Sequence, residues 1–236
     1  MPLPFVPYAV LSAVHLVVLV GGLDGAAVTV TKLLLMPALA VAVLWLGRGR
    51  RRSATIVLLL AAIGLSWAGD AALTGSGATW FIVGLLCFLA AHLAYVVLFA
   101  RESRGGGRFP AWTAVYLAWY AGFLALLAPH LGALIAPVAA YGLVLGAMAA
   151  FAGRVGGLVA VGGALFVVSD TILALGRFLP GYEFAMHDLV VMSTYLGAQW
   201  LIAFGVLRRS RDLTGELSSR ASAAAVPTAA PTTDRS

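Results

Sequence analysis

Eight long apolar runs constrain the fold of this chain more than any other feature. A helix needs about 20 apolar residues to cross a lipid bilayer, and the runs cover residues 5–22, 26–46, 54–73, 79–100, 111–128, 131–151, 155–176 and 187–207. Only 10% of the 236 residues are charged and 62% are hydrophobic, whereas a soluble domain carries roughly 25% charged residues. The sequence therefore predicts an all-α, polytopic transmembrane bundle of about eight spans.

Arginine falls almost wholly in the gaps after the second, fourth, sixth and eighth runs. These positions are Arg48, Arg50, Arg51, Arg52, Arg101, Arg104, Arg108, Arg154, Arg208, Arg209 and Arg211. Arginine-rich loops face the cytoplasm, so we expect an integral, multi-pass protein of the cell membrane with both termini cytoplasmic. Arg177 alone breaks the pattern. The net charge of +6 is therefore a topology signal, and no nucleic-acid partner is expected.

The composition changes near the C-terminus. We predict a transmembrane domain over residues 1–212 and a disordered cytoplasmic tail over residues 213–236, which is rich in Ala, Ser, Thr and Pro. The only cysteine, Cys87, lies in an apolar run, which excludes a disulfide framework and a cysteine-based metal site. The chain also lacks the zinc-helix, phosphate-loop and serine-elbow motifs of common hydrolases. Of the chemistries considered, acid–base catalysis by carboxylates is the one that these observations leave open.

Two aspartates lie inside these apolar runs. Asp70 ends the phrase Ala68-Gly69-Asp70 and Asp170 ends Val168-Ser169-Asp170. An ionised carboxylate in hydrocarbon costs at least about 2.5 kcal/mol, so such residues face a protein interior or a water-filled cavity. The pair is therefore our candidate for a catalytic or transport site.

The two halves of the chain show signs of an internal sequence repeat. Asp70 and Asp170 are 100 residues apart, as are Tyr95 and Tyr195. Four spans per half would give a 4+4 parallel repeat about an axis along the membrane normal. Chance similarity between apolar sequences is the alternative. A repeat would place both aspartates at similar depth on opposite sides of a central cavity.

Lys32 is expected at the same depth as the two carboxyls. At 1.5 Å per residue, Asp70 and Asp170 lie roughly 24 and 22 Å from the cytoplasmic starts of their runs, and Lys32 lies about 9 Å from the outer start of its run. All three then fall in the outer third of the membrane. Lys32 either pairs with a carboxylate or extends its amine to the interface.

Other polar residues lie deeper in the fourth and eighth runs. His92 and Tyr95 share one helix face, and Tyr195 and Gln199 share another. We interpret the tyrosines and the glutamine as interhelical hydrogen-bond partners. His92 is either a packing residue or a proton carrier. Ser169 is no nucleophile for Asp170, because adjacent helix residues do not face each other.

An ordered set of phrases from residue 29 to residue 206 resembles the YhhN-like lysoplasmalogenases, a family of eight-span membrane proteins. The phrases are Thr31-Lys32 with Leu34-Leu35-Met36-Pro37, Gly69-Asp70-Ala71-Ala72-Leu73, Gly84-Leu85-Leu86-Cys87-Phe88 with Ala91-His92-Leu93-Ala94-Tyr95, Gly163-Ala164-Leu165-Phe166 with Ser169-Asp170 and Arg177-Phe178, and Tyr195 with Gln199. The family usually has proline directly after the lysine, whereas Leu33 stands here and proline follows at Pro37.

The resemblance implies hydrolysis of the vinyl ether bond of a lysoplasmalogen to a fatty aldehyde and a glycerophospho-alcohol. Asp70 and Asp170 match the suspected catalytic pair of the family. Protonation of the alkene carbon leaves an oxocarbenium ion, a problem that glycosidases solve with two carboxylates. We hypothesise Asp170 as the acid and Asp70 as the stabilising base, without metal or cofactor. The expected supporting residues are Lys32, His92, Tyr95, Ser169, Arg177, Tyr195 and Gln199.

Two other functions fit the same residues. A proton-coupled transporter or lipid exporter also carries intramembrane ionisable groups and repeated halves, and Pro37 and Pro137 share the 100-residue offset. A structural protein would use the polar residues only as interhelical bonds. The expected partners of the hydrolase are a lysolipid substrate and membrane lipids. The sequence leaves the oligomeric state open.

Overall fold

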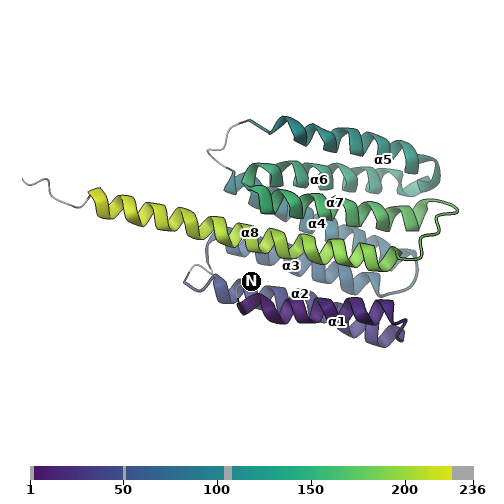
Figure 1. Cartoon of the computed structure of the whole chain (residues 1–236). Coiled ribbons are helices and arrows are strands. Elements are labelled where there is room, and N and C mark those ends of the chain that lie inside the picture. Colours follow the sequence, from purple (N-terminus) through teal and green to yellow (C-terminus); the bar gives the residue numbers. More distant parts are fainter. Residues whose placement is uncertain (1–2, 50–51, 104–107, 225–236) are drawn as a thin grey trace, which may run out of the picture.

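A computed structural model describes residues 3–49, 52–103 and 108–224 of the chain, with side chains up to residue 210. This part of the chain forms helices and no strand (Figure 1). The helices are α1 (Val6–Val20), α2 (Gly25–Leu46), α3 (Ala54–Leu73), α4 (Ala78–Glu102), α5 (Val115–Leu131), α6 (Ile135–Val155), α7 (Gly157–Phe178) and α8 (His187–Ala224), with short 3₁₀ helices at Leu3–Phe5, Ala111–Ala114 and Gly132–Leu134. The all-α prediction is confirmed, and most helix ends lie within four residues of the expected bounds.

Seven helical segments in the described chain are long and apolar enough to cross a membrane. One of them, Ala111–Val155, has 45 residues and contains both α5 and α6. These two helices lie side by side (Figure 1), and Gly132 between them has φ +51°, a left-handed conformation that glycine adopts without a steric penalty. The class of multi-pass membrane protein is confirmed. The count of eight crossings stays a prediction.

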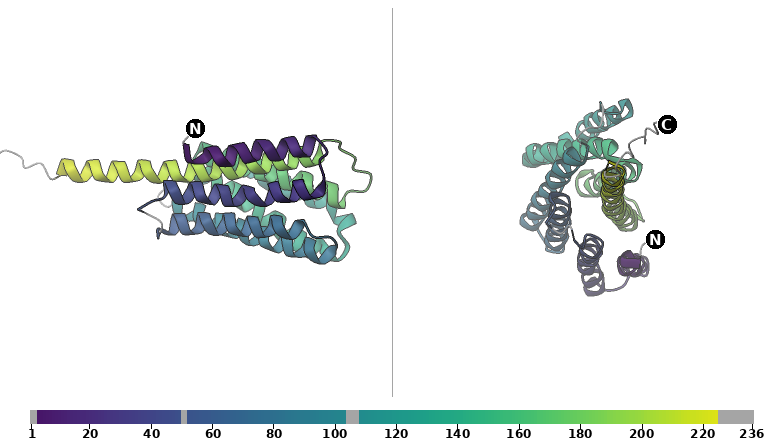
Figure 2. Two further views of the ribbon diagram at one scale, coloured as in Figure 1. Left: turned by 90° about the horizontal axis from the view of Figure 1, so that it is seen from below. Right: turned by 90° about the vertical axis from the view of Figure 1, so that its left-hand side faces the viewer.

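The helices pack in the same order in both halves of the chain. Helix α2 packs between α1 and α3, and α3 packs on α4; in the second half, α6 packs between α5 and α7, and α7 packs on α8. Helix α4 also meets α6, while α8 meets α1 and α2. Helices α1 and α5 therefore lie at opposite edges of the bundle (Figures 1 and 2). This order agrees with a 4+4 repeat, which stays a prediction.

The two ends of the bundle carry different residues. The starts of α1, α3, α5 and α7, the ends of α2, α4 and α6, and the C-terminal part of α8 lie at one end (Figure 1). Most of the described arginines are in or next to these segments, namely Arg48, Arg52, Arg101, Arg108, Arg154, Arg208 and Arg209. Lys32 near the start of α2, and Asp70 and Asp170 near the ends of α3 and α7, lie toward the other end. Which end faces the cytoplasm stays a prediction.

The expected division at residue 212 falls inside a helix. Helix α8 continues to Ala224, so the first part of the expected tail is helical in this structure. The remainder, residues 225–236, lies outside the described residues. The division into a transmembrane domain and a cytoplasmic tail stays a prediction.

Glycines allow α7 to approach its neighbours closely. A Cβ at Gly163 would lie 2.9 Å from the Ala152 Cβ and 3.2 Å from the Ala149 Cα in α6. A Cβ at Gly162 would lie 2.8 Å from the Ile202 side chain in α8. Such close helix contacts replace the hydrophobic effect as the source of packing energy in lipid. They also fix the height of Asp170 relative to both neighbours.

We predict that Gly163→Ala destabilises the bundle. Its new methyl meets the Ala152 Cβ and the Ala149 Cα, neither of which can rotate away, and overpacking of this kind costs about 1–3 kcal/mol. Gly64→Ala is the matched control, because nothing lies within 4 Å of a Cβ there. Thermal unfolding in detergent should show a lower melting temperature for Gly163→Ala alone. Equal melting temperatures for the two variants would contradict the close packing of α6 and α7.

Candidate active site

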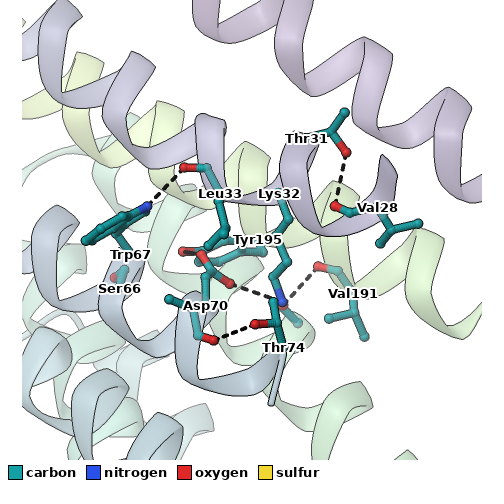
Figure 3. Close-up of polar contacts among 12 residues, drawn as sticks. Val28, Thr31, Lys32, Leu33, Ser66, Trp67, Asp70, Thr74, Val191 and Tyr195 are labelled. Atoms are coloured by element: carbon teal, nitrogen blue, oxygen red, sulfur yellow. Dashed lines mark hydrogen bonds and ion pairs between the residues drawn. The ribbon is translucent and has the colours of Figure 1, made fainter. Parts of the chain in front are cut away.

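A proline in α2 leaves a backbone carbonyl beside Lys32 without its helical hydrogen bond. Pro37 lies inside the helix and has no N–H, so the carbonyl of Leu33, four residues earlier, loses its usual donor. The Trp67 indole of α3 donates to this carbonyl at 3.0 Å (Figure 3). The bond ties α2 to α3 at the residue next to Lys32 and three residues before Asp70.

Asp70 lies among partners from two other helices. The Lys32 ammonium of α2 is 3.4 Å from Oδ1, and the Tyr195 hydroxyl of α8 donates to Oδ2 at 2.8 Å (Figure 3). The Asp70 side chain is 4% exposed and that of Lys32 18%. A cation and a hydroxyl donor together compensate the desolvation of a buried carboxylate. The structure therefore favours the ion pair over the alternative in which Lys32 only reaches the interface.

Asp170 has a different pair of partners. The Tyr141 hydroxyl of α6 donates to Oδ2 at 2.6 Å, and the His92 Nε2 of α4 lies 3.8 Å from the same oxygen. His92 is fully buried, and neither of its ring nitrogens has a hydrogen-bond partner among the described residues. The Asp170 side chain is 11% exposed. Each carboxyl thus accepts a hydrogen bond from one tyrosine and lies near one nitrogen-bearing side chain, from different helices in the two cases.

Aromatic rings connect the surroundings of the two carboxyl groups. The Phe166 ring meets both His92 and Tyr195, at centroid distances of 4.7 and 5.4 Å, and the Phe88 ring meets Tyr195 at 6.0 Å. A partner of each acid therefore contacts Phe166, and both acids lie in the protein interior rather than on lipid-facing surfaces.

An apolar cavity opens beside Asp170. It lies between α3, α4, α5, α6 and α7 and is narrow, with a volume of about 50 Å³. Asp170 is the one ionisable carboxyl among the described lining residues, and Tyr141 and Thr171 are beside it in the wall. The lining residues are Leu73, Phe81, Leu85, Phe88, Trp119, Phe123, Val138, Tyr141, Gly142, Leu145, Asp170, Thr171, Leu173, Ala174 and Phe178. An alkyl chain fits this lining, with its polar end near one acid.

Two predicted residues, Tyr95 and Gln199, form part of a buried chain of hydrogen bonds one helical turn deeper. The Tyr95 hydroxyl donates to Gln199 Oε1, and Gln199 Nε2 donates to the Ser66 hydroxyl at 3.0 Å. Ser66 and Asp70 are on one face of α3, as Gln199 and Tyr195 are on one face of α8. The expectation of interhelical bonds for this group agrees with these contacts, and the chain holds α3, α4 and α8 in register below Asp70.

The remaining predicted residues lie apart from the carboxyl oxygens. The Ser169 hydroxyl donates to the Val191 carbonyl at 3.0 Å and so joins α7 to α8. Arg177 is exposed, and its guanidinium lies 4.9 Å from the ring centroid of Phe81. Among the described residues, no group of three or more His, Cys, Asp or Glu side chains is placed to hold a metal ion.

Sequence reasoning missed Tyr141 and Ser66. Tyr141 is the hydroxyl donor of Asp170, and it stands in the otherwise apolar sixth run much as Tyr95 stands in the fourth. A tyrosine in an apolar run was therefore the sequence signal that could have identified Tyr141. Ser66 precedes Asp70 by one helical turn, which places the two on one face.

Comparisons with known proteins indicate one family. The sequence model of the YhhN family matches residues 27–206. The chain is 36% identical over 151 residues to the lysoplasmalogenase TMEM86B of Rattus norvegicus, covering 64% of this chain and 62% of that protein. It is 36% identical over 152 residues to the Homo sapiens TMEM86B, covering 64% of each.

A bacterial relative gives a similar match. The chain is 35% identical over 170 residues to a lysoplasmalogenase of Mycobacterium bovis, covering 68% of this chain and 62% of that protein. The matches thus span less than two thirds of these relatives' own length. No solved structure matches the chain.

We predict that Lys32→Met destabilises the protein by about 3 kcal/mol, because it leaves a buried carboxylate without its cation. The double variant Lys32→Met/Asp70→Asn should recover much of this loss, since it removes both charges. Equilibrium unfolding in detergent measures the free energies of the single and double variants. If the two changes were simply additive, the ion pair would contribute no coupling energy and our interpretation of Lys32 would be wrong.

Proposed function

This chain belongs to the YhhN family, and from that premise we propose that it is an ether hydrolase of lysolipids. The substrate is a lysoplasmalogen, and the products are a fatty aldehyde and a glycerophospho-alcohol. Its similarity to proteins named lysoplasmalogenases supports this substrate. The observation that carries the proposal is the position of Asp170, a single carboxyl in the wall of an apolar cavity with a tyrosine hydroxyl at 2.6 Å.

In the proposed reaction, Asp170 acts as the general acid. It gives its proton to the outer alkene carbon, whose π electrons form the new C–H bond while the ether oxygen shares the positive charge. The oxocarbenium ion that results is attacked by water, and loss of a proton gives a hemiacetal. The hemiacetal C–O bond to the glycerol then breaks, with a proton returned to the glycerol oxygen. Atoms balance with one water consumed and no cofactor.

Asp70 has the complementary role of stabilising base. The Lys32 ammonium at 3.4 Å favours the ionised form of this carboxyl, so Asp70 contributes negative charge near the oxocarbenium ion and accepts the proton of the attacking water. Two acids with different partners can hold different protonation states in one site, as they do in glycosidases. The partners of Asp70 and Asp170 differ in this sense, because only Asp70 pairs with a lysine.

Two buried side chains support this division. His92 lies 3.8 Å from Asp170 and is the proposed imidazole that returns a proton to it after turnover. Tyr195 donates a hydrogen bond to Asp70 and packs on Phe166. Tyr95, Gln199 and Ser169 position the helices rather than touch the substrate.

The positions of Pro37 and Pro137 do not support the transporter interpretation. Transporters of this type use paired broken helices, and Pro37 and Pro137 were the candidate pair. Helix α2 continues through Pro37, and Pro137 lies in the first turn of α6, where proline is tolerated. We propose the hydrolase over the transporter on this ground. We also propose the cell membrane as its location, with both termini cytoplasmic.

Replacing either aspartate by asparagine should lower turnover at least about 100-fold, the contribution of a general acid or base, while the protein stays folded. The measurement is aldehyde release by purified protein in lipid, with circular dichroism to check folding. Asp188→Asn is the control, because its side chain is 80% exposed. Near-normal hydrolysis by folded Asp70→Asn and Asp170→Asn would refute the two-carboxyl mechanism.

Substrate selection provides a separate prediction. Purified protein should release aldehyde from a lysoplasmalogen, and not from an ester lysolipid, because only the vinyl ether forms an oxocarbenium ion on protonation. The intact plasmalogen should react more slowly because its second chain must also be accommodated beside a narrow cavity. Transport of the intact lysolipid into vesicles without aldehyde would instead favour the transporter.

A further inference from the structure

Arg177 is the one arginine that departs from the charge pattern of the chain, and it lies in the last turn of α7. It is exposed, and its guanidinium is 4.9 Å from the ring centroid of Phe81. Phe81 lines the cavity that contains Asp170, and the Phe178 ring, another wall residue, meets Phe81 at 5.7 Å. The guanidinium therefore lies against a wall residue of the cavity.

The spacing along α7 relates Arg177 to Asp170. Seven residues are two helical turns, so both side chains leave the helix on the same face, about 10 Å apart along the axis. The structure records no ion pair for Arg177 within residues 3–49, 52–103 and 108–210. An exposed guanidinium beside a wall residue of an apolar cavity is suited to a bidentate contact with a phosphate.

We infer that Arg177 binds the phosphodiester of the lysolipid head group and thereby sets the depth at which the vinyl ether meets Asp170. This inference rests on the proposed function. In a lysoplasmalogen the phosphorus and the alkene carbon that receives the proton are separated by seven bonds, about 8 Å in extended form at roughly 1.2 Å per bond. That length agrees with the axial separation of Arg177 and Asp170.

Lys32 does not compete for this role, because its ammonium is paired with Asp70. Lys32 and Arg177, both among the described residues, thus have separate roles. Lys32 compensates a protein carboxylate, and Arg177 compensates the charge of the substrate. The consequence is selection for a phosphate-bearing lysolipid over a neutral alkenylglycerol of the same chain length.

Binding of a non-reactive ligand tests this assignment apart from turnover. The probes are a 1-O-alkyl lysophosphatidylethanolamine, which has the phosphodiester but no vinyl group, the matching 1-O-alkylglycerol, and inorganic phosphate alone. Trp119 lines the cavity, so tryptophan fluorescence in detergent reports binding. Arg177→Gln should weaken binding of the phospholipid analogue about tenfold, the size of one charged hydrogen bond, and leave the alkylglycerol unchanged. Arg177→Lys should retain part of the preference.

Arg48→Gln is the matched control. Arg48 is also exposed and also stacks on an aromatic ring, with its guanidinium 3.6 Å from the Trp45 centroid, but it lies at the opposite end of the bundle. It should bind both lipids as the unaltered protein does. Inorganic phosphate should bind weakly or not at all, since it lacks the chain that fills the cavity.

Three results would overturn the inference: unchanged phospholipid binding by Arg177→Gln, equal weakening for both lipids, or no binding of the analogue by the unaltered protein. Equal weakening would mark Arg177 as a residue that only shapes the cavity. If the unaltered protein binds the analogue through Arg177 but releases no aldehyde from a lysoplasmalogen, the proposed hydrolysis fails and the phosphate site stands.

Discussion

A carboxylate inside a bilayer is stable only where cations and hydrogen-bond donors surround it, and the arrangement of α2, α3 and α8 satisfies this need for Asp70. Lys32 of α2 pairs with one of its oxygens, and Tyr195 of α8 donates to the other. The Trp67 bond to the carbonyl that Pro37 leaves free holds α2 at the height that this pairing requires. One turn deeper, Gln199 and Ser66 repeat the connection between α8 and α3 without charge. The hydrogen bonds and the ion pair between α2, α3 and α8 therefore lie at and just below the level of Asp70.

The environment of Asp170 differs from that of Asp70. Asp170 receives a hydroxyl from Tyr141 and lies near His92, yet no lysine pairs with it, and one side of it adjoins the apolar cavity. Phe166 contacts a partner of each acid, His92 beside Asp170 and Tyr195 beside Asp70. The ammonium beside Asp70 favours its ionised form, whereas the apolar cavity beside Asp170 favours its protonated form. That difference, rather than the mere presence of two acids, makes the site fit for acid–base chemistry on a lipid.

Much of this arrangement could be predicted from the sequence, because polar residues are rare in apolar runs and each must find a partner. The helix bounds, the shared depth of Lys32 and the two aspartates, and the bonding roles of Tyr95 and Gln199 all follow from spacing within single helices. The partners across helices could not be predicted. Nothing in the local sequence says that Tyr195 meets Asp70 while Tyr141 meets Asp170, since this depends on the contacts that glycines such as Gly163 permit between helices.

The central claim is that a buried carboxyl protonates a carbon atom of the lipid. The most direct measurement is hydrolysis of a lysoplasmalogen in D₂O, with the aldehyde trapped by immediate reduction and analysed by mass spectrometry. Protonation at carbon predicts one deuterium on the carbon next to the former carbonyl. Aldehyde formed by the protein without deuterium at that carbon would contradict the account.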